Sequence, residues 1–166
     1  MRFLTFVLIV STLIGSAGCA TNFAESNEQA RDLEAITALS QENVAAINAS
    51  DVGTLLGEFT DDIVFLPADQ PPVVGMAAFE AWVRPIYEQY DLEIEGTIKE
   101  VVVAGDWAFE WGLITGTLRP LAGGEDTQID AKYVYVYERQ SDGSWKCAYD
   151  IVSSSVPSAL PNPRQN

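Results

Sequence analysis

The chain changes its hydrophobic period about halfway along its length. Before Asp91 the apolar residues recur at intervals of three and four, which is the spacing of one face of a helix. After Asp91 they alternate with polar residues at a period of two, which is typical of strands. The pattern therefore predicts helices first and a run of strands afterwards.

The first predicted helix is amphipathic and starts at a capping signal. Residues 26–29 read Ser-Asn-Glu-Gln, the form of a capping box, in which two side chains bond to free backbone N–H groups. A helix should therefore begin at Ser26 and reach about Ala49. One face of it is largely apolar, so the helix is expected to pack on another element. The residues of this face are Leu33, Ile36, Ser40, Val44 and Ile47.

Two shorter helices and one strand are predicted next. Asp51 can cap a short second helix, and the apolar residues 63–66 after it indicate a strand. Three prolines within residues 67–72 then predict a loop. A third helix should start at Met76, and Pro85 within it should kink or split it, because proline removes a backbone donor and crowds the preceding turn.

Four strands are predicted in the second half of the chain. Short turns containing glycine separate them, so consecutive strands should pair as an antiparallel meander. Helices that precede a run of strands predict an α+β domain, with the helices packed on one face of a bent sheet. The predicted strands are residues 92–104, 107–118, 127–139 and 145–152.

The N-terminal residues have the features of a secretory signal peptide. Arg2 precedes an apolar run at residues 3–14, which is shorter than the roughly 20 residues of a transmembrane helix. Ser-Ala-Gly-Cys at residues 16–19 resembles the bacterial lipobox, which implies that Cys19 is lipidated and becomes the mature N-terminus. Ala20 after it favours an anchor on the periplasmic face of the outer membrane. The alternative is an ordinary cleavage near Ala20 that discards Cys19.

The chain is long enough for one domain with a single core, since it has 166 residues of which 48% are hydrophobic. Once Cys19 is lipidated, Cys147 is the single remaining thiol, and we expect it to be a buried strand residue. The expected parts are a signal peptide at residues 1–18, a lipidated N-terminus and tether at 19–25, one folded domain at 26–156 and a flexible tail at 157–166.

The chain is strongly acidic, with 24 acidic and 9 basic residues and a formal charge of −15. This charge repels phosphate backbones and anionic lipid headgroups. Nucleic acid is therefore not an expected partner, and the lipid anchor should be the only contact with the membrane. The acidic residues are scattered rather than gathered in a block, which indicates a role in solubility.

The chain has no histidine, which removes the commonest general base and metal ligand together. Serine triads, cysteine–histidine pairs and histidine-bearing zinc sites are thereby excluded. No glycine-rich phosphate loop is present, and Asp61 and Asp62 lack the regularly spaced oxygen ligands of a calcium loop. We therefore expect no cofactor and no metal, and only carboxylates are left for acid–base chemistry.

Four blocks of the chain carry a family resemblance: "INASDVGTLLGEFTDDIVFLP", "PVVGMAAFEAW", "VVVAGDWAFEWGLITG" and "DGSWKCAYDIVSSSVP". Together they resemble the SnoaL-like branch of the nuclear transport factor 2-like superfamily. The resemblance implies a cone-shaped α+β fold, in which a curved sheet wraps around the long first helix and leaves a pocket at the open end. It also implies a homodimer formed through the outer face of the sheet. Ser153 stands where the family often has asparagine.

Asp150 is a lone carboxylate in the apolar last strand and is the first candidate for catalysis. A carboxylate in an apolar pocket has a raised pKa and can move a proton beside a carbonyl, as in ketosteroid isomerase on this fold. If residues 142–143 form a two-residue turn, Tyr135 lies opposite Asp150 and can serve as its electrophilic partner. A register shifted by one residue places Lys132 diagonal to Asp150 instead. The alternative to catalysis is therefore a structural role, in which the aspartate bonds to backbone groups or to Lys132.

Five further residues are candidates for ligand binding. Glu110 alternates with the aromatic residues on either side of it, so it is expected to point into the same cavity as Asp150 or to lie on a surface edge. The aromatic residues either line an apolar pocket for a small molecule or fill the core and the dimer face. The five candidates are Phe65, Trp82, Glu110, Trp111 and Tyr133.

Three functions fit the sequence. The leading hypothesis is an envelope-anchored domain that binds a small, mostly apolar molecule, which requires a pocket of roughly 300 Å³ or more. The second is a cofactor-free isomerase, cyclase or dehydratase that uses Asp150 as a base, which requires this residue in the pocket without a cationic partner. The third is a dimerisation or assembly module, which a filled cone would indicate.

Overall fold

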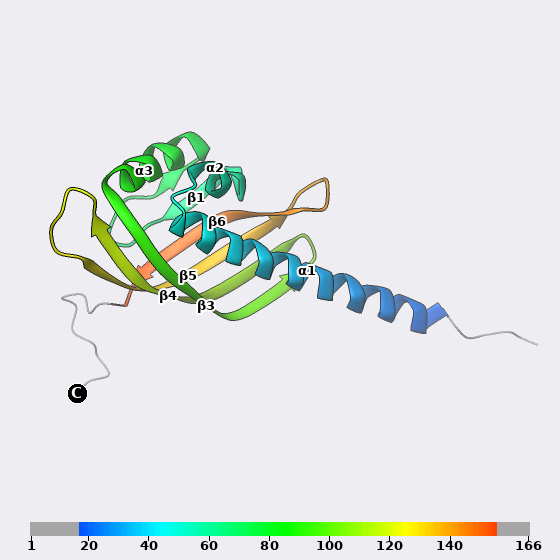
Figure 1. The fold of residues 1–166 in the computed structure, drawn as a ribbon. Helices are drawn as coiled ribbons and strands as arrows, with labels where there is room; N and C mark the ends of the chain where they lie inside the picture. The colour runs from blue at the N-terminus through cyan, green and yellow to red at the C-terminus, as the bar shows by residue number, and fades with distance from the viewer. Residues whose placement is uncertain (1–16, 156–166) are drawn as a thin grey trace, which may run out of the picture.

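A long helix lies across the concave face of a bent six-stranded sheet (Figure 1). The computed structural model describes the backbone of residues 17–155 and the side chains of residues 26–155. Two shorter helices cover one end of the sheet (Figure 1). The prediction of an α+β domain, with its helices packed on one face of a curved sheet, is confirmed.

The long helix α1 (Ala17–Asn48) begins before its capping signal. Residues 20–25 contain no glycine or proline, so nothing breaks the helix in the segment expected to be a tether. The predicted start at Ser26 is therefore wrong. Asn48 fixes the other end of α1 to the sheet, because its amide group exchanges two hydrogen bonds with the backbone of Ile94, at 3.0 and 2.7 Å.

The two shorter helices are α2 (Val52–Gly57) and α3 (Met76–Gln89). Asp51 caps α2 as predicted, since its carboxylate accepts the backbone N–H of Thr54 at 3.0 Å. Pro85 lies inside α3, yet α3 is one continuous helix, so the proline does not split it.

The sheet has the strand order β2-β1-β6-β5-β4-β3. β1 and β6 pair in parallel and all other neighbours are antiparallel, so the predicted meander of the last four strands is confirmed. The two-residue strand β2 follows directly after prolines and is too short to show an alternating pattern. The strands are β1 (Phe59–Leu66), β2 (Val73–Val74), β3 (Tyr90–Ala104), β4 (Trp107–Pro120), β5 (Thr127–Arg139) and β6 (Trp145–Ser154).

The last hairpin places Tyr135 opposite Asp150 through two irregularities that cancel. A two-residue turn at residues 142–143 would pair Arg139 with Lys146. In the structure Arg139 pairs with Trp145, so the register near the turn is shifted by one residue. The ladder then skips Ala148, an extra residue in β6 that acts as a bulge and restores the count. The predicted pairing of Tyr135 with Asp150 is therefore confirmed, although the predicted turn is not.

Buried polar side chains join α1 to the sheet. Arg139 of β5 donates to both carboxylate oxygens of Asp32, each at 2.7 Å. Ser40 donates to Glu110 of β4 at 2.7 Å, and both side chains are buried. The apolar core lies around these contacts and includes the fully buried Ile36.

Residues 1–16, which include most of the predicted signal peptide, lie outside the described residues, as does the predicted tail. Cys19 lies in the first turn of α1, where side chains are not described, so its lipidation stays a prediction. Within residues 17–155, no helix has both the length and the mean hydropathy needed to cross a bilayer.

Candidate functional site

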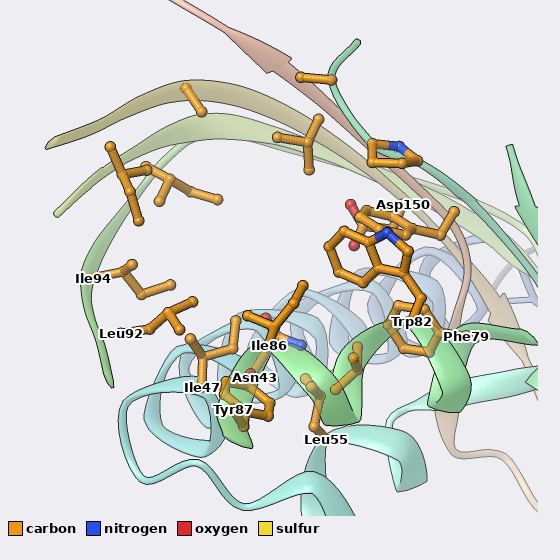
Figure 2. A pocket seen from close by; sticks show the side chains of 18 of the residues that line it. Asn43, Ile47, Leu55, Phe79, Trp82, Ile86, Tyr87, Leu92, Ile94 and Asp150 are labelled. Atoms are coloured by element: carbon orange, nitrogen blue, oxygen red, sulfur yellow. The ribbon is translucent and has the colours of Figure 1, made fainter. Parts of the chain in front are cut away.

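A cavity of about 320 Å³ lies between the sheet, the C-terminal half of α1, and α3 (Figure 2). Apolar side chains from all three helices and from the inner face of the sheet form most of its wall. Among the residues that the structure describes, Asp150 is the only aspartate, glutamate, lysine or arginine that lines it. The site is therefore a hydrophobic hollow with a single acidic group.

The bend of the sheet and the position of α1 together create this hollow. α1 packs on the sheet through a face that mixes polar residues with the buried Ile36, and it ends at Asn48. α3 closes the space beyond it with Trp82 and Ile86. The strands contribute branched apolar residues such as Ile94 and Ile114.

Asp150 has no compensating partner in the cavity. Its side chain is 7% exposed, its Oδ1 atom is buried without a hydrogen bond, and no residue within 17–155 bonds to or forms an ion pair with its carboxylate. Lys132 is exposed and pairs with Ser153 in the ladder, so the ion pair of the shifted register does not form. Burial raises the pKa of Asp150 to about 8, because the charged carboxylate loses its hydration.

Tyr135 also lines the cavity, but its hydroxyl group is engaged elsewhere. It donates to Oδ1 of Asn43 at 3.3 Å, and Nδ2 of Asn43 in turn donates to Oε2 of Glu58 at 2.7 Å. Burial is the main reason that the pKa of Glu58 is raised to about 7. A short polar chain thus runs from the cavity wall into the core.

Asn43 and Glu58 were not among the site residues predicted from the sequence. A signal for Asn43 was present, because it follows Ser40 by three residues and so lies on the helix face that packs on the sheet. Glu58 follows a short helix and precedes a strand, a position at which most carboxylates are solvated, and nothing in its sequence context indicated burial.

Phe65 and Trp82 line the cavity as predicted. Their rings meet edge to face with 4.7 Å between centroids, and Phe79 packs on Phe65 at 5.5 Å. The indole N–H of Trp82 donates to Oε1 of Gln70 at 3.1 Å. These rings give the end of the cavity near Asp150 an aromatic wall (Figure 2).

Glu110 and Tyr133 do not line this cavity. Glu110 is fully buried under α1, where it accepts hydrogen bonds from Ser40 at 2.7 Å, Tyr133 at 2.6 Å and Tyr137 at 3.4 Å. Burial raises the pKa of Glu110, and the hydroxyl donors oppose that rise. Glu110 faces the concave side as predicted, but α1 covers that part of the sheet, so the predicted cavity position is wrong.

Trp111 lies on the outer face of the sheet and is 39% exposed. Its indole N–H donates to Oε2 of Glu100 at 3.1 Å. Trp107 and Phe109 are exposed on the same face. These residues occupy the face at which the family resemblance implies a dimer, and the dimer itself stays a prediction.

Within residues 17–155, no cluster of three or more cysteine, aspartate and glutamate side chains is arranged to hold a metal ion. Cys147 is buried and donates its thiol to the backbone oxygen of Tyr149 at 3.2 Å. Burial is also the main cause of its strongly raised pKa, so this thiol is not a reactive thiolate.

Comparisons with known proteins agree with this architecture. A family model for the SnoaL-like domain matches residues 40–148. A ketosteroid isomerase-like protein from Erwinia carotovora atroseptica superposes with a TM-score of 0.71 at 27% identity, covering 76% of this chain and 98% of that chain.

Two solved structures from Novosphingobium aromaticivorans share the fold at lower identity. An NTF2-like protein with a cystatin-like fold has a TM-score of 0.65 at 17% identity, covering 84% of this chain and 92% of its own. A candidate scytalone dehydratase has a TM-score of 0.72 at 14% identity, covering 85% and 98%. No curated protein sequence matches the chain.

We expect Asp150→Asn to make the fold less sensitive to pH. The folded-state pKa of Asp150 is about 8, above the unperturbed value of about 3.9, so the folded chain keeps a proton that the unfolded chain loses. The contribution of this group to stability is fully present below about pH 3.9. It is lost as the pH rises from there to about 8, by at most about 1.4 kcal/mol per pH unit.

Urea unfolding of the wild type and of Asp150→Asn at about pH 5 and about pH 8 measures this effect. The stability of the variant relative to the wild type should increase with pH. Because Glu58 titrates in both proteins, the difference between them isolates Asp150. A difference that does not change with pH would show that Asp150 is ionised throughout.

Proposed function

We propose that this chain, which belongs to the SnoaL-like domain family, binds a small and mostly apolar molecule in the cavity that contains Asp150. The volume of the cavity, about 320 Å³, carries this proposal. It falls in the range of small-molecule sites, which are concave, mostly apolar and equipped with a few polar groups that set orientation. Protein interiors are otherwise close-packed, so a hollow of this size needs a reason.

An assembly module without a ligand is less well supported. An assembly module without a ligand would be more stable with a filled core, because the atoms that line a cavity lose dispersion contacts. It also has no use for a buried carboxylate without a partner. A ligand would supply both the missing contacts and the missing partner.

Proton transfer by Asp150 is the alternative, and one solved relative is named ketosteroid isomerase-like. That reaction requires a donor to stabilise the developing oxyanion beside the base. Tyr135 would be the donor, but its hydroxyl group is directed to Asn43. Binding needs no such donor, and we therefore favour it.

A neutral probe tests the proposed function. We expect 4-phenylbutan-1-ol to bind saturably and to change the fluorescence of Trp82, which lines the cavity. Ala131→Phe places a ring in the cavity and should weaken binding at least about tenfold, a change of ~1.4 kcal/mol. Val134→Phe is the matched control, since it lies on the same strand but does not line the cavity.

Calorimetric titration gives the affinities of the three proteins for this probe. Equal affinity in wild type and Ala131→Phe would place the probe elsewhere on the molecule. Absence of saturable binding by the wild type would overturn the proposal.

We further propose that the domain is tethered to the periplasmic face of the outer membrane through lipidated Cys19. The lipobox-like residues that precede it support this proposal. The intact mass of the protein extracted from its own membrane should include the acyl chains. Cys19→Ala should move the protein to the soluble fraction, and a wild-type mass without lipid would contradict the anchor.

A further inference from the structure

We propose that the ligand of this cavity is an apolar amine, bound as an ammonium ion whose counter-ion is Asp150. This inference rests on the proposed function, because it names the chemical class of the molecule that the same cavity takes. The surroundings of the carboxylate, the rings beside it and the charge of the whole chain each support it.

Within residues 26–155, the carboxylate of Asp150 has no positively charged partner. No lysine or arginine of this part of the chain lines the cavity, and Oδ1 of Asp150 is buried without a hydrogen bond. An unpaired buried carboxylate is costly, whereas the same group paired with a cation and a hydrogen-bond donor is compensated. An ammonium group supplies the charge and three N–H donors together.

Aromatic residues flank Asp150 on both sides along the sheet. Phe65 is its ladder partner on β1 and Tyr135 is its ladder partner on β5. The indole ring of Trp82 packs against Phe65 from α3, with 4.7 Å between the ring centroids. Ring faces attract ammonium groups within about 6 Å, so the rings and the carboxylate favour the same kind of ion.

The net charge of the chain is negative, like the charge of an ionised Asp150. The formal charge of −15 produces a potential that attracts small cations and repels small anions. Three described arginines are paired with acids elsewhere: Arg84 of α3 with Glu80, Arg119 of β4 with Asp91 and Asp126, and Arg139 of β5 with Asp32 and Asp106. Among the described residues, no lysine or arginine lines the cavity and competes with a cationic ligand.

The titratable groups around Asp150 are all neutral or acidic. Tyr135 and Cys147 interact electrostatically with Asp150, and Tyr87 lines the cavity from α3. Glu58 lies behind Asn43 and interacts with Tyr87. The pKa values of all four groups are raised, so none of them supplies a positive charge to Asp150.

These properties give amine binding a proton signature. In the empty cavity at neutral pH, Asp150 holds a proton, because its pKa is about 8. When an ammonium ion enters, the carboxyl O–H bond breaks, the proton leaves to solvent and the carboxylate pairs with the ammonium group. A neutral alcohol binds to the protonated acid instead and releases no proton.

Isothermal titration with matched ligands tests this inference. The probes are 4-phenylbutylamine, 4-phenylbutan-1-ol and 4-phenylbutanoate, which share one apolar body and differ in the terminal group. Near neutral pH we expect the amine to bind at least about tenfold more tightly than the alcohol, and the carboxylate more weakly than both. Titrations in buffers of different ionisation enthalpy should show that close to one proton is released with the amine and none with the alcohol.

Two variants separate the charge from the cavity. Asp150→Asn keeps the shape of the side chain, so the amine should lose its advantage and its proton release while the alcohol retains its affinity. Asp62→Asn removes an exposed acidic residue of β1 and should change neither affinity. If Asp150→Asn does not fold, the proton release and the ligand ranking of the wild type decide the question alone.

The outcomes distinguish this inference from the proposed function. Saturable binding of the alcohol, with no preference for the amine or no proton release, would overturn the amine assignment and leave the binding function intact. Binding of neither probe would overturn both. Tighter binding of the carboxylate than of the amine would also contradict the inference, because Asp150 could not then be the counter-ion.

Discussion

The position of α1 on the sheet depends on hydrogen bonds buried between them. Ser40 donates to Glu110 of β4 at 2.7 Å, and Asn43 donates at 2.7 Å to Glu58, which directly precedes β1. A buried polar group is stable only when it is paired, so these bonds define where along the sheet the helix can lie. Because Asn48 then ends α1 at β3, the bend of the sheet beyond it is left for α3 to cover. The cavity is the space that α1 and α3 do not fill.

Glu110 and Asp150 are two acids on the concave side of the sheet with opposite surroundings. Glu110 accepts hydrogen bonds from three hydroxyl groups. One of them belongs to Ser40, so Glu110 helps to hold α1 on the sheet. Asp150 has no such donors and faces the hollow. The fold therefore satisfies one buried acid with its own side chains and leaves the other unpaired, which is where we propose that a ligand binds. Retaining an unsatisfied acid costs stability, which is a common feature of functional sites.

The sequence predicted most of the fold because strand periodicity and turn residues are local signals. Its account of the site was less complete, because the part of the concave face that α1 covers depends on long-range contacts. Glu110 was therefore assigned to the cavity, and Asn43 was overlooked. The pairing of Tyr135 with Asp150 came out right only because the turn and the bulge at Ala148 shift the register in opposite directions. Such compensation cannot be read from the hydrophobic pattern.

The titration of Asp150 shows whether this residue lies in the hollow as an acid without a partner. Carbon-13 NMR of protein labelled at the aspartate carboxyl groups, with Asp150→Asn used for assignment, follows this group through pH. The account predicts a midpoint at about 8 in the empty protein. A midpoint near the unperturbed value of about 3.9 would mean that Asp150 is solvated or paired, and would contradict the account.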